Sequence, residues 1–240
     1  MQKQRFRNVS YDSMIRSLHY MSKVDDLIDD GEEFLNLSRQ LKAADIDSET
    51  LTQILNQVSP RCTDLIIDCI WMSSPVDCGS IFSTEPTDDG RCCTFNGPLS
   101  NPVDQFVHDY GLHAGLRLIL HTDTDDFAVT TSRFDGFRVL LHHDNDYPDI
   151  RKRGFVTGPG VETFVAVNRI SIHSTASVAQ LPFEKRFCYF PDEGRLRYFR
   201  NYSASACFSD CRYTHIVDKC DCEPHFFQGY LLDFNALKFL

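Results

Sequence analysis

The stretch CFSDCRYTHIVDKCDCEPHFF runs from Cys207 to Phe227 and contains four cysteines, and no further cysteine follows Cys222. A structural zinc site usually presents two pairs of cysteines, each pair about two to four residues apart. Cys220 and Cys222 are separated by a single residue, which is an unusual spacing for holding one tetrahedral ion. We therefore expect disulfides rather than zinc, and the question for the fold is what these four thiols pair with.

The chain has ten cysteines in 240 residues, and they lie in two clusters. The first cluster consists of Cys62, Cys69, Cys78, Cys92 and Cys93, and the second of Cys188, Cys207, Cys211, Cys220 and Cys222. Clustered cysteines at this density are typical of disulfides formed in an oxidising compartment. Three glycosylation sequons, at Asn8, Asn36 and Asn201, agree with an extracellular location.

Charge and motif content exclude several classes of function. The net charge of −10 argues against nucleic-acid binding, which needs clustered Lys and Arg. The sequence lacks the motifs of a catalytic serine, a zinc-protease helix and a phosphate-binding loop. Cys92 and Cys93 are adjacent, and in a cysteine-rich chain such a pair is normally structural. The sequence therefore predicts neither an enzyme nor a cofactor.

Neither export nor anchoring is visible in the sequence. The first residues, MQKQRFRNVSYDS, lack the apolar core of a signal peptide. No run of about 18 apolar residues could span a membrane. The cysteines indicate an extracellular protein, so the two observations conflict.

Hydrophobic spacing predicts helices first and strands later. Met14, Leu18 and Met21 share one helical face. A second helical face consists of Leu51, Ile54, Leu55 and Val58, and Pro60 follows it. From about Cys92 the period becomes two, in the segments 116–120, 137–141, 161–167 and 170–172. A helix is expected again from Tyr202 to about Lys219. The predicted class is α+β, with helices flanking an antiparallel β core.

Two polar segments superficially look like metal sites. The run His142-His143-Asp144-Asn145-Asp146 lies at the end of a predicted strand, where neighbouring side chains point to opposite faces, so the two histidines cannot easily share an ion. Asp123 begins a weak match to a calcium loop that lacks the glycine at position six and the glutamate at position twelve. Both segments are better explained as polar loops, and no metal site is predicted.

A series of motifs follows in a fixed order along the chain. They are Cys69-x8-Cys78, Gly90-Arg-Cys92-Cys93-Thr-Phe-Asn96, Gly115-Leu116, Gly136-Phe137-Arg-Val139-x-Leu-His142, Pro148, Gly158-Pro-Gly160-Val-Glu-Thr-Phe164-Val, Arg186-x-Cys188, and Tyr202-Ser203 with the cysteines from Cys207 to Cys222 and Pro224. Together they make the chain from about Cys62 to Phe227 resemble the extracellular region of the DEG/ENaC family of amiloride-sensitive sodium channels. The double cysteine is similar to the arthropod pickpocket branch.

The resemblance implies a partial disulfide set. In the family, the cysteines that match Cys188, Cys207, Cys211, Cys220 and Cys222 pair with five others further along a cysteine-rich thumb, and those partners are missing from this chain. The family partner of the Cys92 position likewise lies upstream of the first residue. Cys69 and Cys78 match a family disulfide with both ends present. We predict an additional bridge between Cys62 and Cys93, since it leaves Cys92 for its missing partner.

The resemblance also implies an incomplete domain. Residues 1–68 would form a helical finger, 69–187 the palm and β-ball strands, and 188–228 the start of the helical, cysteine-rich thumb. Residues 229–240 do not match the family and form a tail. The family's two transmembrane helices and pore sequence have no counterpart here. We expect a truncated portion of a plasma-membrane subunit, lying on the extracellular side, that in its intact form joins homologous subunits as a homo- or heterotrimer and conducts sodium ions.

Asp146 is the candidate gating residue. In acid-sensing members of the family, two carboxylates after a palm strand help to form a pocket that faces the thumb. The matching positions are Asn145 and Asp146, so one carboxylate is left and the proton coupling of a close carboxylate pair is weakened. We therefore do not expect an acid sensor.

A second hypothesis is a secreted, disulfide-rich binding module without channel activity. The two hypotheses differ in what flanks the coding sequence: transmembrane segments for the channel subunit, or a signal peptide and an early stop for the binding module.

Overall fold

The computed structural model of the chain describes residues 56–87, 89–97, 106–123, 135–143, 146–168, 173–187 and 202–220, and in addition positions 39, 53, 170, 189–190, 193–194 and 196–199. The helix predicted around Met14, Leu18 and Met21 lies outside the described residues. Residues 56–58 are helical, and the helix ends before Pro60, as the sequence predicts.

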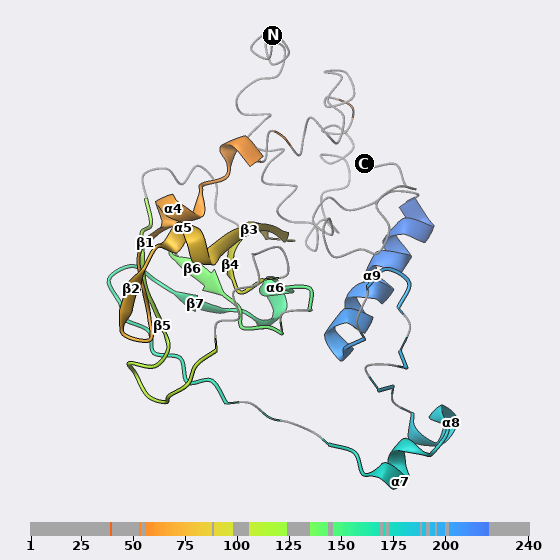
Figure 1. Ribbon diagram of the computed structural model, residues 1–240. Coiled ribbons are helices and arrows are strands. Elements are labelled where there is room, and N and C mark those ends of the chain that lie inside the picture. The colour runs from red at the N-terminus through yellow and green to blue at the C-terminus, as the bar shows by residue number, and fades with distance from the viewer. Residues whose placement is uncertain are drawn as a thin grey trace.

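Short helices and antiparallel strands alternate through the described residues. Their order is α4 (Cys62–Leu65), β1 (Ile66–Trp71), β2 (Ser74–Val76), α5 (Cys78–Ile81), β3 (Phe82–Thr87), β4 (Gly90–Phe95), β5 (Leu116–Leu120), β6 (Phe137–Val139), α6 (Ile150–Arg153), β7 (Phe155–Thr157), α7 (Ala176–Ala179), α8 (Phe183–Arg186) and α9 (Ala204–Cys220). Figure 1 shows the strands gathered in one region, with α9 at their side and α7 and α8 at the end of an arm. Because helices and antiparallel sheets are both present, the predicted α+β class is confirmed at this level.

A three-stranded sheet with the order β2-β1-β5 holds the first hydrophobic core. Across the β1–β5 pair, Cys69 lies opposite Leu118. Cys62, Ile66 and Cys69 are buried together, and Leu118 and Leu120 pack against them. Leu118 and Leu120, two positions apart on one face of β5, therefore contact this core, which explains why the alternation correctly predicts a strand.

A second sheet, the β3–β4 hairpin, is joined to this core covalently. Thr84 in β3 lies opposite Cys93 in β4. Cys93 forms a disulfide with Cys62, and a second disulfide joins Cys69 to Cys78. These are the two pairs named from the sequence. The first disulfide joins α4, which leads directly into β1, to the hairpin, and the second joins β1 to α5.

The β6–β7 pair is attached to the hairpin by an ion pair. Arg138 in β6 contacts the carboxylate of Asp89 at 3.0 Å, and their side chains are only 22% and 17% exposed. Gly136 directly precedes β6, at a close approach of two backbones, because a Cβ there would lie 2.2 Å from the carbonyl oxygen of Thr157. Its φ of +130° is also one that only glycine adopts easily. The turn predicted at Asp135-Gly136 thus has a steric cause.

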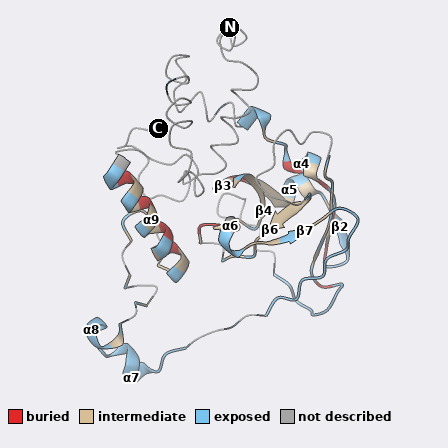
Figure 2. Cartoon of the chain, turned by 180° about the vertical axis from the view of Figure 1, so that it is seen from behind, coloured by how far each residue is buried: buried red, intermediate tan, exposed pale blue. Residues whose placement is uncertain are grey.

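Helix α9 forms the second hydrophobic core. Tyr147 and Phe199 are buried with Ala206, Tyr213 and Val217 of the helix. Figure 2 shows the buried residues of α9 along one side and exposed residues along the other. The helix predicted from Tyr202 to Lys219 is confirmed to within two residues at its start.

The strand predicted over 161–167 is wrong. This segment has no ladder partner among the described residues, and Val161, Phe164 and Val167 are 63%, 64% and 71% exposed. Alternation of apolar residues indicates an extended chain, but a strand also needs a neighbour to bond with. Strands also begin earlier than the period of two indicates. β1 starts at Ile66, inside the range 1–68 that the resemblance assigns to a helical finger.

We predict that Cys93 rather than Cys92 holds Cys62. Cys93→Ser should remove the cross-link to the peptide that contains Cys62, and Cys92→Ser should leave it in place. The bridge spans a sequence separation of 31 residues, so its loss should lower the free energy of unfolding by about 3–4 kcal/mol in the loop-entropy model. Non-reducing peptide mapping and urea unfolding of both variants measure these effects. A cross-link that disappears in Cys92→Ser would contradict the assignment.

Candidate functional site

Ser203 caps the start of α9. Its Oγ accepts a hydrogen bond from the backbone N–H of Ala206 at 3.0 Å, and its carbonyl accepts one from the N–H of Cys207 at 2.9 Å. The first amides of a helix have no partner within the helix, so a serine at this position satisfies one of them with its side chain. Ser203 therefore fixes where α9 begins.

The same hydroxyl binds Asp146. Ser203 donates its Oγ–H to Oδ1 of Asp146, which lies 57 positions earlier in the chain. The carboxylate thus lies at the positive end of the α9 dipole, where negative charge is favourable. The N–H of Asp146 bonds to the carbonyl of His143, and the next residue, Tyr147, is buried against α9. Asp146 is therefore held from both sides in front of the helix.

Arg153 adds a second polar contact to the first turn of α9. Its Nη2 donates to Oγ of Ser205 at 2.8 Å. Arg153 ends α6, so both ends of the segment 146–153 contact the start of α9. The segment leads directly into β7, so these contacts connect the start of α9 to the β6–β7 sheet.

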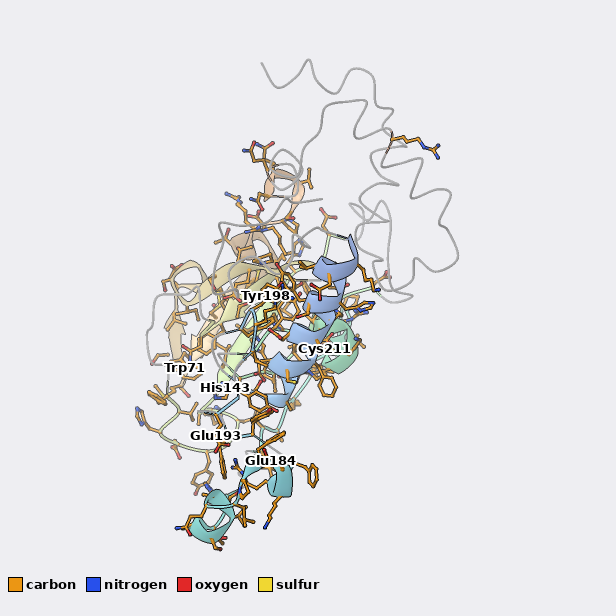
Figure 3. The ribbon with its side chains drawn as sticks, turned by 90° about the vertical axis from the view of Figure 1, so that its right-hand side faces the viewer. Trp71, His143, Glu184, Glu193, Tyr198 and Cys211 are labelled. Carbon is orange, nitrogen blue, oxygen red and sulfur yellow. A yellow bond between two sulfur atoms is a disulfide. The ribbon has the colours of Figure 1, made fainter. Side chains whose placement is uncertain are left out.

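A strap of residues 196–199 fixes the rest of the helix. Asp210 accepts a hydrogen bond from the N–H of Tyr198 at 2.8 Å, and Arg197 forms an ion pair with Asp218 at 3.1 Å. The ring of Tyr198 meets that of Tyr213 edge-on, with centroids 4.3 Å apart. In Figure 3 Tyr198 lies beside α9, with Glu193 further along toward α8. The helix is thus held along its length by a strap and at its start by Asp146.

Charge on the chain before α9 is organised around Glu193. The backbone N–H of Phe190 and then the guanidinium of Arg186 lower the pKa of Glu193 below its usual value. The guanidinium of Arg186 contacts the Glu193 carboxylate at 2.6 Å, and the Arg186 side chain is 4% exposed. In the strap, the hydrogen bond with Asp218 raises the pKa of Arg197.

The cysteines and sequons of the second half are only partly within the described residues. Cys207 is half-buried and Cys211 exposed, and both carry free thiols. Cys188, Cys222, Asn8, Asn36 and Asn201 lie outside the described residues, as does the side chain of Cys220. Cys92 lies in β4 with its Sγ 3.3 Å from Oγ1 of Thr87. That these cysteines pair with others that are missing from this chain therefore stays a prediction.

The described residues contain no cluster of three or more side chains that could hold a metal ion. Within the polar run after β6, the Nδ1 of His142 lies 2.8 Å from the carbonyl of His143. Asp144 and Asn145 lie outside the described residues. No helix in the described part is long and apolar enough to cross a membrane.

Sequence reasoning named Asp146 and missed its partners. Ser203 precedes a helix, which is an N-cap signal that the sequence does contain. Arg153 carries no such signal, because its contact with Ser205 depends on how two distant segments fold together.

We expect Ser203→Ala to lower the free energy of unfolding by about 1 kcal/mol, the usual cost of a lost N-cap. Ser203→Asp should restore the cap acceptor yet place a second carboxylate beside Asp146, so it should recover less than Ser203→Asn. Urea unfolding followed by circular dichroism ranks the three variants. Equal stability of Ser203→Asp and Ser203→Asn would show that Asp146 does not face the cap.

The pH dependence of stability should carry a signature of Glu193. Its pKa is lowered in the folded state, so its carboxylate stabilises the fold above its ordinary value of 4.5, and this contribution is lost as the pH falls through the lowered pKa. As the pH falls from neutral to below the lowered pKa of Glu193, the free energy of unfolding should therefore decrease more for wild type than for Glu193→Gln. Glu184→Gln, an exposed change in α8, is the control and should follow wild type. The same decrease in the free energy of unfolding at acid pH for wild type and Glu193→Gln would refute the prediction.

Comparison with known proteins identifies the family. The family model described as amiloride-sensitive sodium channel matches residues 2–236. The sodium channel protein Nach of Drosophila virilis is 28% identical over 196 residues, which cover 79% of this chain and 48% of that protein. Pickpocket protein 28 of Drosophila melanogaster is 24% identical over 70% of this chain and 34% of its own length.

A vertebrate relative matches as well. Acid-sensing ion channel 1A of Danio rerio is 28% identical over 71% of this chain and 33% of its own length. The chain thus spans less than half the length of these relatives. The resemblance to the DEG/ENaC family and its pickpocket branch is confirmed, and the relatives are channels rather than enzymes. The chain belongs to the amiloride-sensitive sodium channel family.

Proposed function

We propose that this chain is part of the extracellular region of a sodium channel subunit. In this assignment 1–68 belongs to the finger, 69–187 to the palm and β-ball, and 188–228 opens the thumb with α9 as its first helix. The intact subunit joins homologous subunits as a trimer in the plasma membrane and conducts sodium ions. Family membership over residues 2–236 supports the proposal. The sequons at Asn8, Asn36 and Asn201 would carry glycans on the outer side.

The contact between Asp146 and Ser203 is the observation on which the gating proposal rests. It links the segment that leads into β7 with the start of α9. Tyr147 of that segment and α9 share the second hydrophobic core, whereas the disulfide-linked strands contain the first. A hydrogen bond to a charged group contributes about 1.5–3 kcal/mol, which is enough to shift a two-state equilibrium tenfold or more. Gating would then involve a change in this contact, with α9 as the element that moves.

We expect Asp146→Asn and Ser203→Ala each to shift the closed–open equilibrium of the full-length channel, and the double variant to shift it no further than the larger single change. Residues that act through one shared bond are non-additive by about 1 kcal/mol or more. Single-channel open probability of the amiloride-sensitive current in oocytes measures the three shifts.

Charge reversal provides the sharper test. Asp146→Lys places a cation at the positive end of α9 and should shift gating by more than Asp146→Asn. Asp68→Lys makes the same charge change on an exposed position of β1 and serves as the matched control. Unchanged gating in Asp146→Lys at normal surface expression, or a shift of the same size in Asp68→Lys, would overturn the gating role of Asp146.

A further inference from the structure

Helices α7 and α8 form an arm that lies away from both the strands and α9 (Figure 1). The arm is largely exposed, and Phe187 after α8 is 84% exposed. After the arm the chain returns to the start of α9 through residues that include Tyr189, Gly194 and Tyr202. The connection between arm and helix therefore depends on what these residues contact.

Three aromatic rings lie in series between α8 and Ser203. Phe183 of α8 stacks on Tyr189 with centroids 4.2 Å apart and planes 15° apart. Tyr189 meets the ring of Tyr202 edge-on at 5.3 Å. Tyr202 directly precedes the Ser203 cap. Tyr189 is 43% exposed, so its two ring contacts are not a by-product of burial in a core.

Gly194 allows the last ring of the series to sit where it does. A Cβ at position 194 would lie 2.3 Å from Cγ of Tyr202, which is shorter than any real contact. The chain at Gly194 therefore packs directly on the Tyr202 ring.

A separate polar clasp makes the base of the arm rigid. Arg186 holds Glu193 at 2.6 Å, and the Arg186 guanidinium lies 4.5 Å from the centre of the Phe190 ring. Glu193 also accepts the N–H of Phe190 at 3.1 Å, and the N–H of Glu193 returns to the carbonyl of Phe190 at 3.0 Å. The loop from α8 to Gly194 is thus closed on itself by side-chain and backbone contacts.

We propose that Phe183, Tyr189 and Tyr202 form a ring relay that makes the arm and the first turn of α9 move as one body, with Tyr189 as the positioning residue. A displacement of the arm then moves Ser203 relative to Asp146. The mechanical link is inferred from the ring contacts and the packing of Gly194 on Tyr202. Its consequence for gating rests on the proposed function.

Hydrogen exchange of the full chain tests the link without any channel activity. Tyr189→Leu keeps an apolar side chain but removes the ring, and Tyr189→Phe keeps the ring. In Tyr189→Leu the amides of Ala206 and Cys207, which bond to Ser203, should exchange about three- to tenfold faster, the range expected for one aromatic pair. Tyr189→Phe should match wild type, as should Phe187→Leu, which alters an exposed ring outside the relay.

The position of the effect separates a relay from general destabilisation. A relay speeds exchange at Ala206 and Cys207 and leaves the amide of Val217 unchanged, whereas a loss of folding speeds all three. Gly194→Ala, which displaces Tyr202 by steric contact, is the second variant and should reproduce the Tyr189→Leu pattern. Wild-type exchange at Ala206 in both variants, or equal acceleration in Tyr189→Phe and Tyr189→Leu, would overturn the relay.

In the full-length channel, Tyr189→Leu should then shift gating in the same direction as Ser203→Ala. A positive exchange result with unchanged gating would leave the relay standing and count against the gating proposal. Changed gating with unchanged exchange would count against the relay.

Discussion

The hydroxyl of Ser203 joins the segment that leads into β7 to the start of helix α9. It accepts from the N–H of Ala206 and donates to Asp146, and one hydroxyl can do both because it has one hydrogen and two lone pairs. Helix α9 needs this support. Its buried face consists largely of Ala206, Ser209, Tyr213 and Val217, of which two are small. Since helical stability in proteins comes mostly from packing of the apolar face, a narrow face leaves more to the ends.

The contacts of α9 differ in kind along its length. At its middle the buried rings of Tyr147 and Tyr213 belong to one apolar cluster, while its start adds hydrogen bonds from Ser203 to Asp146 and from Arg153 to Ser205. Separating two apolar surfaces costs free energy in proportion to the apolar area that becomes exposed to water. A hydrogen bond near the surface can instead be replaced by one to water at small net cost. In the proposed gating movement, the start of α9 would therefore be the end that changes partners, and its middle would be the pivot.

The sequence predicts those parts of the fold that depend on local pattern. The alternation of 116–120 and the turn at Asp135-Gly136 both describe the structure, because each reflects a direct steric or burial cause at those residues. The alternation of 161–167 misleads, since pairing depends on a neighbour that the pattern does not contain. The hydrophobic pattern does not predict β1, IIDCIW, because its buried residues are Ile66, Cys69 and Trp71, which do not alternate regularly. A shift in the pairing between Ile66 and Asp68 breaks the period of two.

The candidate site shows the same limit. Asp146 was found by matching family positions, and Ser203 was within reach of the N-cap rule. Arg153 and the rings of Tyr189 and Tyr202 could not be found from sequence, because their partners are set by how segments far apart come together. Gly194 is a similar case, because any larger residue there would collide with the ring of Tyr202, which lies eight residues later in the chain but in direct contact in space.

Covalent links in the described residues lie on one side of the Asp146–Ser203 contact. Both disulfides placed there, Cys62–Cys93 and Cys69–Cys78, join strands and short helices of the first core. That unit contacts β6 through the ion pair of Arg138 with Asp89, which is not a covalent link. Helix α9 is held to the β6–β7 region through Asp146, Tyr147 and Arg153 without a disulfide among the described residues. A force applied to such a molecule moves the part whose contacts re-form at least cost, so α9 should rotate about Tyr147 before the disulfide-linked strands deform. In the proposed channel, the boundary between the moving and the fixed part would then lie at Asp146.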